Sequence, residues 1–362
     1  MQSSTANTTF RAILQNVGAV FPTLAEMHAL GVLGRFTPEF GRLTCKVQHE
    51  LYHRYTADVH ILRCIGELDK VFQGDEENTH PYGEILRKTE VPALLYLMIF
   101  LHDLGKSQGP KGHCERGVEI ATNLLERFAV PEEMRDRILF VVQHHLEMVR
   151  YFYKYDVEDP KVIDAFAAFV GSEQRLCYLY VHSYCDANGT SPDLWNAYKD
   201  ELHHQLFTKT LRVLRGRPAE RDPATLRKAY ANLEIGDLSI EQIADHLDHF
   251  PNRYFAHSGR EEVALHLSMT VRFRQESLQE TVDPEHLAVV EWRDDLRRSL
   301  TIVNVVTKDR LGLFEKVTGA FAIGGMNILG ARAFTRCDEV AIDVFFVEKD
   351  DPALGTDEAE TR

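Results

Sequence analysis

The chain has 362 residues, so at about 150 residues per domain its length predicts two or three domains. Hydrophobic residues make up 44% of it and charged residues 27%, which is typical of a globular protein with a real core and excludes wholesale disorder. The net charge of −14 argues against nucleic acid or an anionic membrane as a partner, because phosphate contacts need a surplus of lysine and arginine on one face.

The sequence also bears on where the chain resides. Its longest apolar run, 91–101, contains Pro92 and is shorter than the roughly 20 residues that span a bilayer. The first residues have no basic stretch followed by an apolar one, so no secretory signal is visible. The six cysteines are scattered without a C-x-x-C pair. This pattern predicts reduced thiols and a cytoplasmic location.

Residues 1–210 are predicted to be mainly helical, because apolar residues recur there at spacings of three and four. The predicted helices include 91–106, 115–129, 133–152, 161–169 and 173–187. A solvated linker with two prolines and four arginines follows at 212–223, and residues 211–298 as a whole are expected to be a helical extension. Within it, Ser239 and Gln242 have the spacing of a helix capping box.

The pattern changes near residue 299. A β-branched stretch at 299–307 predicts a strand, the turn 309–312 leads into a helix at 313–323, and two more strands are expected at 327–335 and 340–348. This order predicts a small α+β module at 299–349 that lacks a second helix and a fourth strand, followed by a disordered tail at 350–362. We expect the first strand to pair with both of the others and one sheet edge to stay open.

In that module the turn 309–312 reads Asp309, Arg310, Leu311 and Gly312. The helix after it has Leu313, Val317 and Phe321 at four-residue spacing, so one of its faces is expected to be buried against the sheet.

The most informative feature of the chain is the pair His102-Asp103 at the end of an apolar helix, followed by Lys106 and a glycine-rich loop. An imidazole and a carboxylate can ligate one divalent cation together. Taken alone, such a pair could also be a helix cap. Further polar residues on inward faces of predicted helices favour a metal site, because a buried carboxylate needs a cation or several donors. These residues are His60, His145 and Asp186.

The order His60, His102-Asp103, Asp186 resembles the HD superfamily of metal-dependent phosphohydrolases, which are all-α proteins. His113 and His145 resemble the two further histidines of members that hold a second metal ion. Longer stretches are similar to the bifunctional PII uridylyltransferase/uridylyl-removing enzyme family, and the α+β module is similar to the start of an ACT domain, which has a ferredoxin-like fold. These stretches are 31–36, 48–53, 159–166, 175–180, 190–196, 251–255 and 308–313.

The resemblance implies an HD-type helical bundle followed by an incomplete ACT-like module, and a hydrolase that removes UMP from a PII-type regulatory protein. Lys106 and Asp103 would be catalytic, and the turn 309–312 would bind an effector, with glutamine as the candidate. The metal would be Mn, Mg, Zn, Fe or Co, which the residue types do not distinguish. Its expected ligands are His60, His102, Asp103, His113, His145 and Asp186.

The sequence departs from that family in several places. The nucleotidyltransferase motif is missing, since Gly171-Ser172 is not followed by two aspartates, so uridylyltransferase activity is not expected. The loop before His113 lacks the usual acidic neighbour. Two alternatives stay open: a nucleotide phosphohydrolase or cyclic-nucleotide phosphodiesterase of the HD superfamily, and a non-catalytic amino-acid-sensing module.

Overall fold

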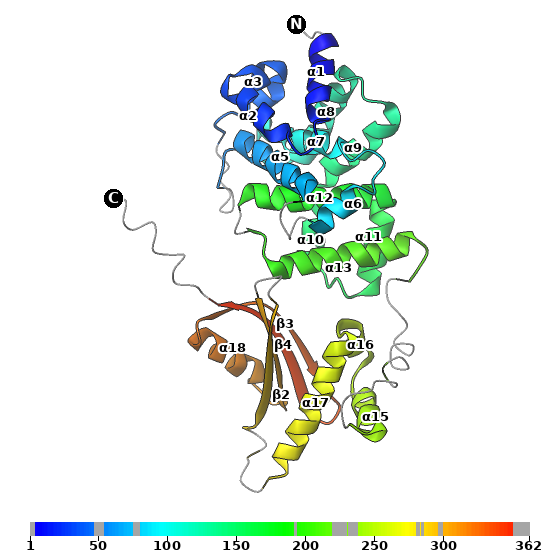
Figure 1. Cartoon of the computed structure of the whole chain (residues 1–362), viewed down its shortest axis with the longest axis vertical. Helices are drawn as coiled ribbons and strands as arrows, with labels where there is room; N and C mark the ends of the chain where they lie inside the picture. Colours follow the sequence, from blue (N-terminus) through cyan, green and yellow to red (C-terminus); the bar gives the residue numbers. More distant parts are fainter. Residues whose placement is uncertain are drawn as a thin grey trace, which may run out of the picture. The chain divides into compact units, whose positions relative to one another are not determined.

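The computed structural model describes residues 4–46, 54–74, 80–191, 194–218, 230, 238–279, 283, 286–295 and 300–349 (Figure 1). The chain divides into two compact units, Met1–Ala219 and Glu220–Arg362. The first is helical, and the second contains helices and a four-stranded antiparallel sheet. A mainly α fold followed by a small α+β module is therefore confirmed. The stretch 48–53, residues 219–223 of the predicted linker and the predicted tail lie outside the described residues.

The first unit is built from short and medium-length helices around one core. They are α1 (Ser4–Leu14), α2 (Val20–Ala29), α3 (Val32–Phe36), α4 (Pro38–Gly41), α5 (Ala57–Gln73), α6 (His80–Leu86), α7 (Leu94–Leu101), the 3₁₀ helix η1 (Leu104–Gln108), α8 (His113–Arg127), α9 (Glu132–His144), α10 (Glu147–Lys154), α11 (Pro160–Val170), α12 (Glu173–Thr190) and α13 (Ala197–Leu214).

Two features of these helices position the site. All eight residues of α7 are apolar and buried, as expected of a helix that is hydrophobic all round and crosses the middle of a core. Helix α12 packs along α5 over much of its length. Helices α8 and α9 pack on each other, and α9 also contacts α7. The C-terminal end of α7 therefore lies among α5, α8, α9 and α12.

The predicted helix 133–152 is in fact two helices, α9 and α10, with a break at His145 and Leu146. The imidazole Nδ1 of His145 lies 3.0 Å from the carbonyl oxygen of Val142. In a continuous helix that carbonyl would accept the backbone N–H of Leu146. The side chain thus takes over a backbone acceptor and ends the helix, which apolar periodicity does not anticipate.

The second unit contains α15 (Ile240–His249), α16 (Asn252–His257), α17 (Arg260–Ser277), β1 (Ala288–Asp295), β2 (Leu300–Lys308), α18 (Leu313–Ile323), β3 (Met326–Thr335) and β4 (Val340–Lys349). The predicted capping box is present, because the Ser239 hydroxyl accepts the Gln242 N–H and the Gln242 side chain accepts the Ser239 N–H. The predicted helix at 313–323 and the three predicted strands are confirmed to within a residue or two.

Two expectations about the sheet are wrong. Residues 288–295, expected to belong to a helical extension, form the strand β1, and the strand order is β1-β2-β4-β3. Strand β2 pairs with β4 as expected, but its other neighbour is β1, and β3 pairs with β4 alone. The sheet is therefore not a three-stranded fragment. In the sequence of β1, AVVEWRDD, apolar and polar residues alternate poorly and the last three side chains are charged, so the pattern did not predict a strand.

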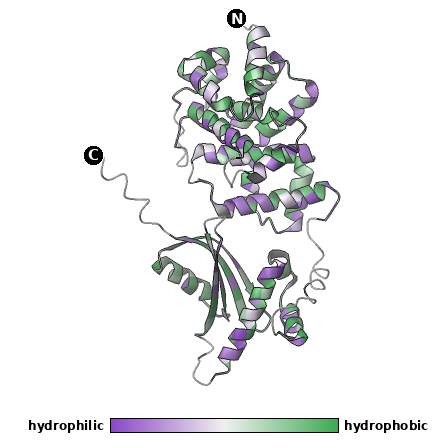
Figure 2. Ribbon diagram, in the orientation of Figure 1, coloured by the Kyte–Doolittle hydropathy of each residue, from purple (hydrophilic) through white to green (hydrophobic). Residues whose placement is uncertain are grey.

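Helices cover both faces of the sheet. On one face Val303, Val305 and Phe345 pack against α18, where Leu313 is buried and Val317 and Phe321 are partly buried, which confirms the predicted helix face. On the other face Val306 and Ile342 pack against α15, α16 and α17. Figure 2 shows that α18 is largely hydrophobic in colour.

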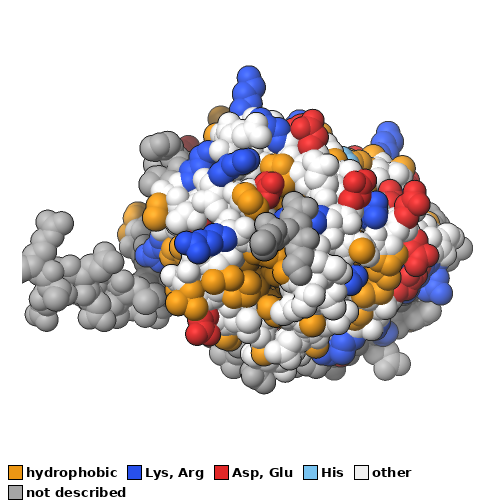
Figure 3. Space-filling model, turned by 90° about the horizontal axis from the view of Figure 1, so that it is seen from above, with side chains coloured by type: hydrophobic (Ala, Val, Ile, Leu, Met, Phe, Trp, Pro, Cys, Tyr) orange, Lys and Arg blue, Asp and Glu red, His pale blue; other side chains and the backbone are white. Residues whose placement is uncertain are grey.

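No helix in the described part of the chain is both long and apolar enough to cross a membrane. Figure 3 views the molecule from above, and among the described residues on that face the basic side chains form no continuous surface. Acidic, hydrophobic and uncharged atoms separate them.

Candidate metal centre

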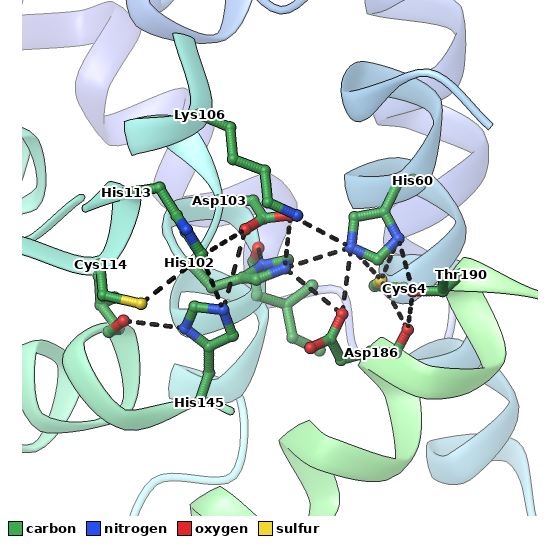
Figure 4. A network of polar contacts seen from close by, with 12 residues as sticks. His60, Cys64, His102, Asp103, Lys106, His113, Cys114, His145, Asp186 and Thr190 are labelled. Atoms are coloured by element: carbon green, nitrogen blue, oxygen red, sulfur yellow. Dashed lines mark hydrogen bonds and ion pairs between the residues drawn. The ribbon is translucent and has the colours of Figure 1, made fainter. Parts of the chain in front are cut away.

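The site forms where α7 ends. His102 follows the last residue of α7, Asp103 follows it, and both are only 1% exposed. The ring Nδ1 of His102 lies 2.7 Å from the carbonyl oxygen of Ile99, an acceptor that a longer helix would give to the N–H of Asp103. As at His145, the imidazole ends its own helix. It thereby turns the carboxylate of Asp103 away from the helix axis and into the polar cluster shown in Figure 4.

His60 and Asp186 reach this pair from two helices that approach each other very closely. His60 lies near the start of α5 and Asp186 in the last turns of α12. Between them Gly189 touches α5: a β-carbon at residue 189 would lie 2.8 Å from the backbone nitrogen of Cys64 and 2.9 Å from its α-carbon. Only a glycine permits this approach, and the approach brings the side chains of residues 60 and 186 into contact.

Four side chains converge at one point. His60 Nε2 lies 3.1 Å from Asp186 Oδ1 and 3.4 Å from Asp103 Oδ2. His102 Nε2 lies 3.4 Å from the same oxygen of Asp103 and 3.6 Å from that of Asp186. The two Nε2 atoms are 3.3 Å apart. The expected convergence of His60, His102, Asp103 and Asp186 is thus what the structure has.

These separations fit a metal ion. Four donors at about 2.0–2.2 Å from a tetrahedral ion are separated from each other by roughly 3.3–3.6 Å, and the five distances above run from 3.1 to 3.6 Å. Two imidazoles and two carboxylates are also a donor set that divalent transition metals accept. The residues present therefore fit the ion that the sequence pattern implies.

The tautomers of the histidines point to the same conclusion. His102, His113 and His145 each place Nδ1 within 2.7–3.0 Å of the carbonyl oxygen three residues earlier. A carbonyl oxygen only accepts, so each Nδ1 carries the proton and donates it. In the neutral ring, which is the form that binds a metal, Nε2 presents a lone pair, and this is the arrangement of a metal-ligating imidazole held by a backbone carbonyl.

A second group of donors adjoins the first through Asp103. Its other oxygen, Oδ1, lies 3.5 Å from His113 Nε2 and 3.8 Å from His145 Nε2. The two Nε2 atoms are 3.5 Å apart. His145 is 1% exposed, whereas the side chain of His113 is 12% exposed. The carboxylate of Asp103 thus faces one donor group with each of its oxygens, as a bridging ligand would.

Closely packed elements bring His113 to this position. A β-carbon on Gly105 would collide with the carbonyl oxygen of His113 and would lie 2.7 Å from the backbone nitrogen of Gly117. The lack of a side chain on Gly105 lets the start of α8 press against η1, directly behind Asp103.

Burial and charge shift the pKa values in opposite directions within the cluster. Burial alone would lower the pKa of His102, but the carboxylates of Asp103 and Asp186 outweigh it and raise that pKa to about 10. Burial raises the pKa of Asp103, yet Lys106 and His102 more than offset this and hold it well below its usual value. For His145, burial and the neighbouring His102 lower the pKa to about 4. The two buried carboxylates thus depend on nearby positive charge, which a bound cation would also supply.

Lys106 lies at the rim of the cluster. Its ammonium group is 2.7 Å from Asp103 Oδ2, and its side chain is 13% exposed. The side chains of His113 and Asp186 are exposed to a similar extent, 12% and 16%, whereas the remaining donors are almost inaccessible. Among the described residues of the cluster, solvent therefore reaches Lys106, His113 and Asp186.

Sequence reasoning missed two side chains at the site. Cys114, at the start of α8, has its sulfur 3.5 Å from His113 Nε2. His182 is fully buried one turn before Asp186, its ring centroid is 5.0 Å from that of His102, and neither of its nitrogens has a hydrogen-bond partner among the described residues. The four-residue spacing of His182 from Asp186 was the available signal for it.

The predicted effector turn lies in the second unit, between β2 and α18. The Asp309 N–H donates to Glu339, and its carboxylate accepts a 2.9 Å hydrogen bond from the Thr335 hydroxyl. Leu311 is fully exposed, and Gly312 has a φ of 77°, in the left-handed region that glycine favours. These residues belong to a different unit from the metal cluster.

Comparison with known proteins agrees with the predicted resemblance. The chain is 33% identical over 350 residues to the bifunctional uridylyltransferase/uridylyl-removing enzyme of Rhodospirillum rubrum, covering 95% of this chain and 36% of that enzyme. It is 33% identical to the enzyme of the same name from Phenylobacterium zucineum, covering 90% and 34%. The enzyme from Azospirillum brasilense is 31% identical, with 95% and 36% covered. No family model matches the chain.

The resemblance to the bifunctional uridylyltransferase/uridylyl-removing enzymes is therefore confirmed, and the chain corresponds to a part of them. It spans little more than a third of the length of these relatives.

Proposed function

We propose that this chain is a metal-dependent phosphodiester hydrolase of the uridylyl-removing type. The observation that carries the proposal is the convergence of two imidazoles and two carboxylates, 3.1–3.6 Å apart, at the end of a buried helix. The similarity to enzymes whose name includes a uridylyl-removing activity supports the reaction type. By the same similarity, the proposed substrate is a PII-type protein that carries a uridylyl group.

In this proposal His60, His102, Asp103 and Asp186 would hold one divalent ion, and His113 and His145 would join Asp103 in holding a second. Such ions polarise a phosphoryl oxygen and activate water for attack on phosphorus. The residue types are compatible with Mn, Mg, Zn, Fe or Co at the first position.

The chain's own groups have separate tasks. The backbone-held imidazoles keep their Nε2 atoms aimed inward, and the buried walls of α7 and α12 exclude bulk water, which strengthens every charge interaction at the site. Lys106, whose ammonium group lies 2.7 Å from Asp103 Oδ2 and is partly exposed, would neutralise the negative charge that develops on the phosphate. Asp103 is the central carboxylate, since each of its oxygens faces one donor group.

The test combines elemental analysis with a hydrolysis assay. Purified protein should contain a divalent metal and release UMP from uridylylated PII, and His102→Ala or Asp103→Ala should lower the rate by roughly a thousandfold, since a metal contributes several kcal/mol to the transition state. His144→Ala is the matched control, because this residue adjoins His145 but is partly exposed and lies outside the donor groups.

Two outcomes would contradict the proposal. One is full activity in a folded Asp103→Ala variant, and the other is hydrolysis of free nucleotides with no hydrolysis of uridylylated PII.

We also propose that the chain acts in the cytoplasm, because its six cysteines are free.

A further inference from the structure

Cys114 is the one sulfur donor among the groups of possible metal ligands in the described residues. It follows His113 directly in the first turn of α8, and its Sγ atom lies 3.5 Å from His113 Nε2. The donor atoms of Cys114, His113 and His145 all lie within 4.8 Å of one another. In Figure 4 the sulfur points toward the His145 ring, on the side of Asp103 away from His60.

The separation of this sulfur from His113 and that of the two histidines from each other match those of a tetrahedral zinc site. With Zn–S near 2.3 Å and Zn–N near 2.0–2.1 Å, a sulfur and a nitrogen on the same ion are separated by roughly 3.5–3.6 Å, and two nitrogens by roughly 3.3–3.4 Å. The observed values are 3.5 Å from Cys114 to His113 and 3.5 Å between the two histidines. Asp103 Oδ1 completes the set at 3.5 and 3.8 Å.

We propose that the second metal position is a cysteine-containing site formed by His113, Cys114, His145 and Asp103, and that it takes a thiophilic transition metal such as zinc. This deepens the proposed function and rests on the metal centre described above. A thiolate ligand favours zinc over magnesium or manganese, whereas the first position offers nitrogen and oxygen alone. The two positions therefore differ in the metals they prefer. On binding, the Cys114 thiol loses its proton to solvent and the sulfur becomes a thiolate ligand.

The other cysteine near the cluster provides an internal comparison. Cys64 Sγ lies 3.6 Å from both ring nitrogens of His60. Equal distances to both nitrogens place this sulfur beside the ring rather than along the Nε2 lone pair. Cys64 also belongs to none of the candidate ligand groups. It is expected to remain a thiol when metal binds.

The experiment loads the metal-free full chain with cobalt and records the near-ultraviolet absorption for the sulfur-to-cobalt charge-transfer band. We expect two equivalents to bind and the band to accompany one of them. Cys114→Ser should lose the band and bind that equivalent of zinc at least about tenfold more weakly, since tenfold is the smaller effect of losing a group that merely orients a ligand. Cys64→Ser should keep both the band and the affinity.

Three results would overturn the inference: binding of two equivalents without a thiolate band, a band that survives in Cys114→Ser, or a band lost only in Cys64→Ser. Failure of the proposed function looks different. If the wild-type chain shows the cysteine-dependent band but hydrolyses no phosphodiester, the cysteine-containing site is supported and the proposed hydrolase activity is contradicted. Absence of any bound metal removes both.

Discussion

His60 and Asp186 show why much of the centre could be predicted from single residues. Each is polar and lies on the inward face of a largely apolar helix, and a buried carboxylate is too costly to keep without a cation or donors. Cys114 gave no such signal, because a cysteine on an inward face is an ordinary small hydrophobic residue. Its position beside His113 and His145 depends on the fold of the preceding loop, which no local sequence pattern predicts.

At the same scale, replacing Lys106 should separate catalysis from metal binding. Lys106→Gln removes the ammonium group beside Asp103 but no metal ligand, so kcat should fall by roughly a hundredfold with metal content unchanged. Lys106→Arg should restore part of the rate. The exposed Lys111, on the next loop, is the matched control as Lys111→Gln. If Lys106→Gln loses metal, the lysine instead holds the metal ligands in position.

Asp343 is a buried carboxylate in the second unit, and it predicts a pH dependence of stability. Burial, with the carboxylate of Asp309 nearby, raises the pKa of Asp343 from 3.8 to about 6. The folded state then binds this proton more tightly than the unfolded state does. The free energy of unfolding should therefore fall as pH rises from about 4 to about 6 and stay low above that.

Asp343→Asn removes this cost. We expect the second unit to gain roughly 1–2 kcal/mol at pH 7, less than the full shift implies because solvent screens part of the effect. The gain should vanish near pH 4. Hydrogen-exchange protection of the β2 and β4 amides measures it, with the exposed Glu315→Gln on α18 as comparison. Equal protection in both forms at pH 7 would show that the carboxylate is already well compensated.

Helices and strands could be predicted where one hydrophobic periodicity dominated the sequence. The prediction failed where a side chain ended a helix and where a strand lay at the edge of the sheet. The strands at 300–308 and 340–349 are rich in β-branched and aromatic residues, and these two and the strand at 326–335 were predicted. Strand β1 was not predicted, because a strand at the edge of a sheet can have few apolar residues. The break between α9 and α10 was missed because an imidazole captures the Val142 carbonyl.

The contact between α5 and α12 allows a test on whole elements. Gly189→Ala would place a methyl group on the backbone of Cys64, so the helices must separate or deform, at a cost of roughly 1–3 kcal/mol. Because His60 and Asp186 lie on these two helices, metal affinity should fall together with the melting temperature. Calorimetric titration with the metal checks this. Gly66 on α5 is the control as Gly66→Ala, because a β-carbon there would make only ordinary contacts, at 3.5 Å or more, with the Phe21 ring.

The division of the chain into two units predicts that metal affects them unequally. An ion that binds only the folded first unit at a hundred times its Kd should stabilise that unit by about 2.7 kcal/mol. Removing it with a chelator should lower one calorimetric transition and leave the other unchanged. Hydrogen exchange in α5 and α12, compared with β2 and β4, assigns the transitions. A uniform loss of protection across both units would mean that they unfold as one.

We predict weak or absent glutamine binding by the whole chain. The expected open sheet edge is not the reason, because β1 fills that position. The reason lies in the effector turn itself. Asp309 is already hydrogen-bonded to Thr335 and Leu311 is fully exposed, so the described residues of the turn form no enclosing wall. Isothermal titration with glutamine decides it. Tight binding that raises hydrolysis would contradict the expectation.

The shared hydrogen bond of His102, His113 and His145 has a kinetic consequence. A loose imidazole would have to rotate, change tautomer and lose conformational entropy on meeting a metal ion, and each step would slow capture. Here the rings are fixed during folding by carbonyl groups of their own chain. Uptake of the ion should therefore need no rotation of these rings, and its rate should be limited by loss of the ion's water and of the Nε2 proton of His102 rather than by movement of the protein.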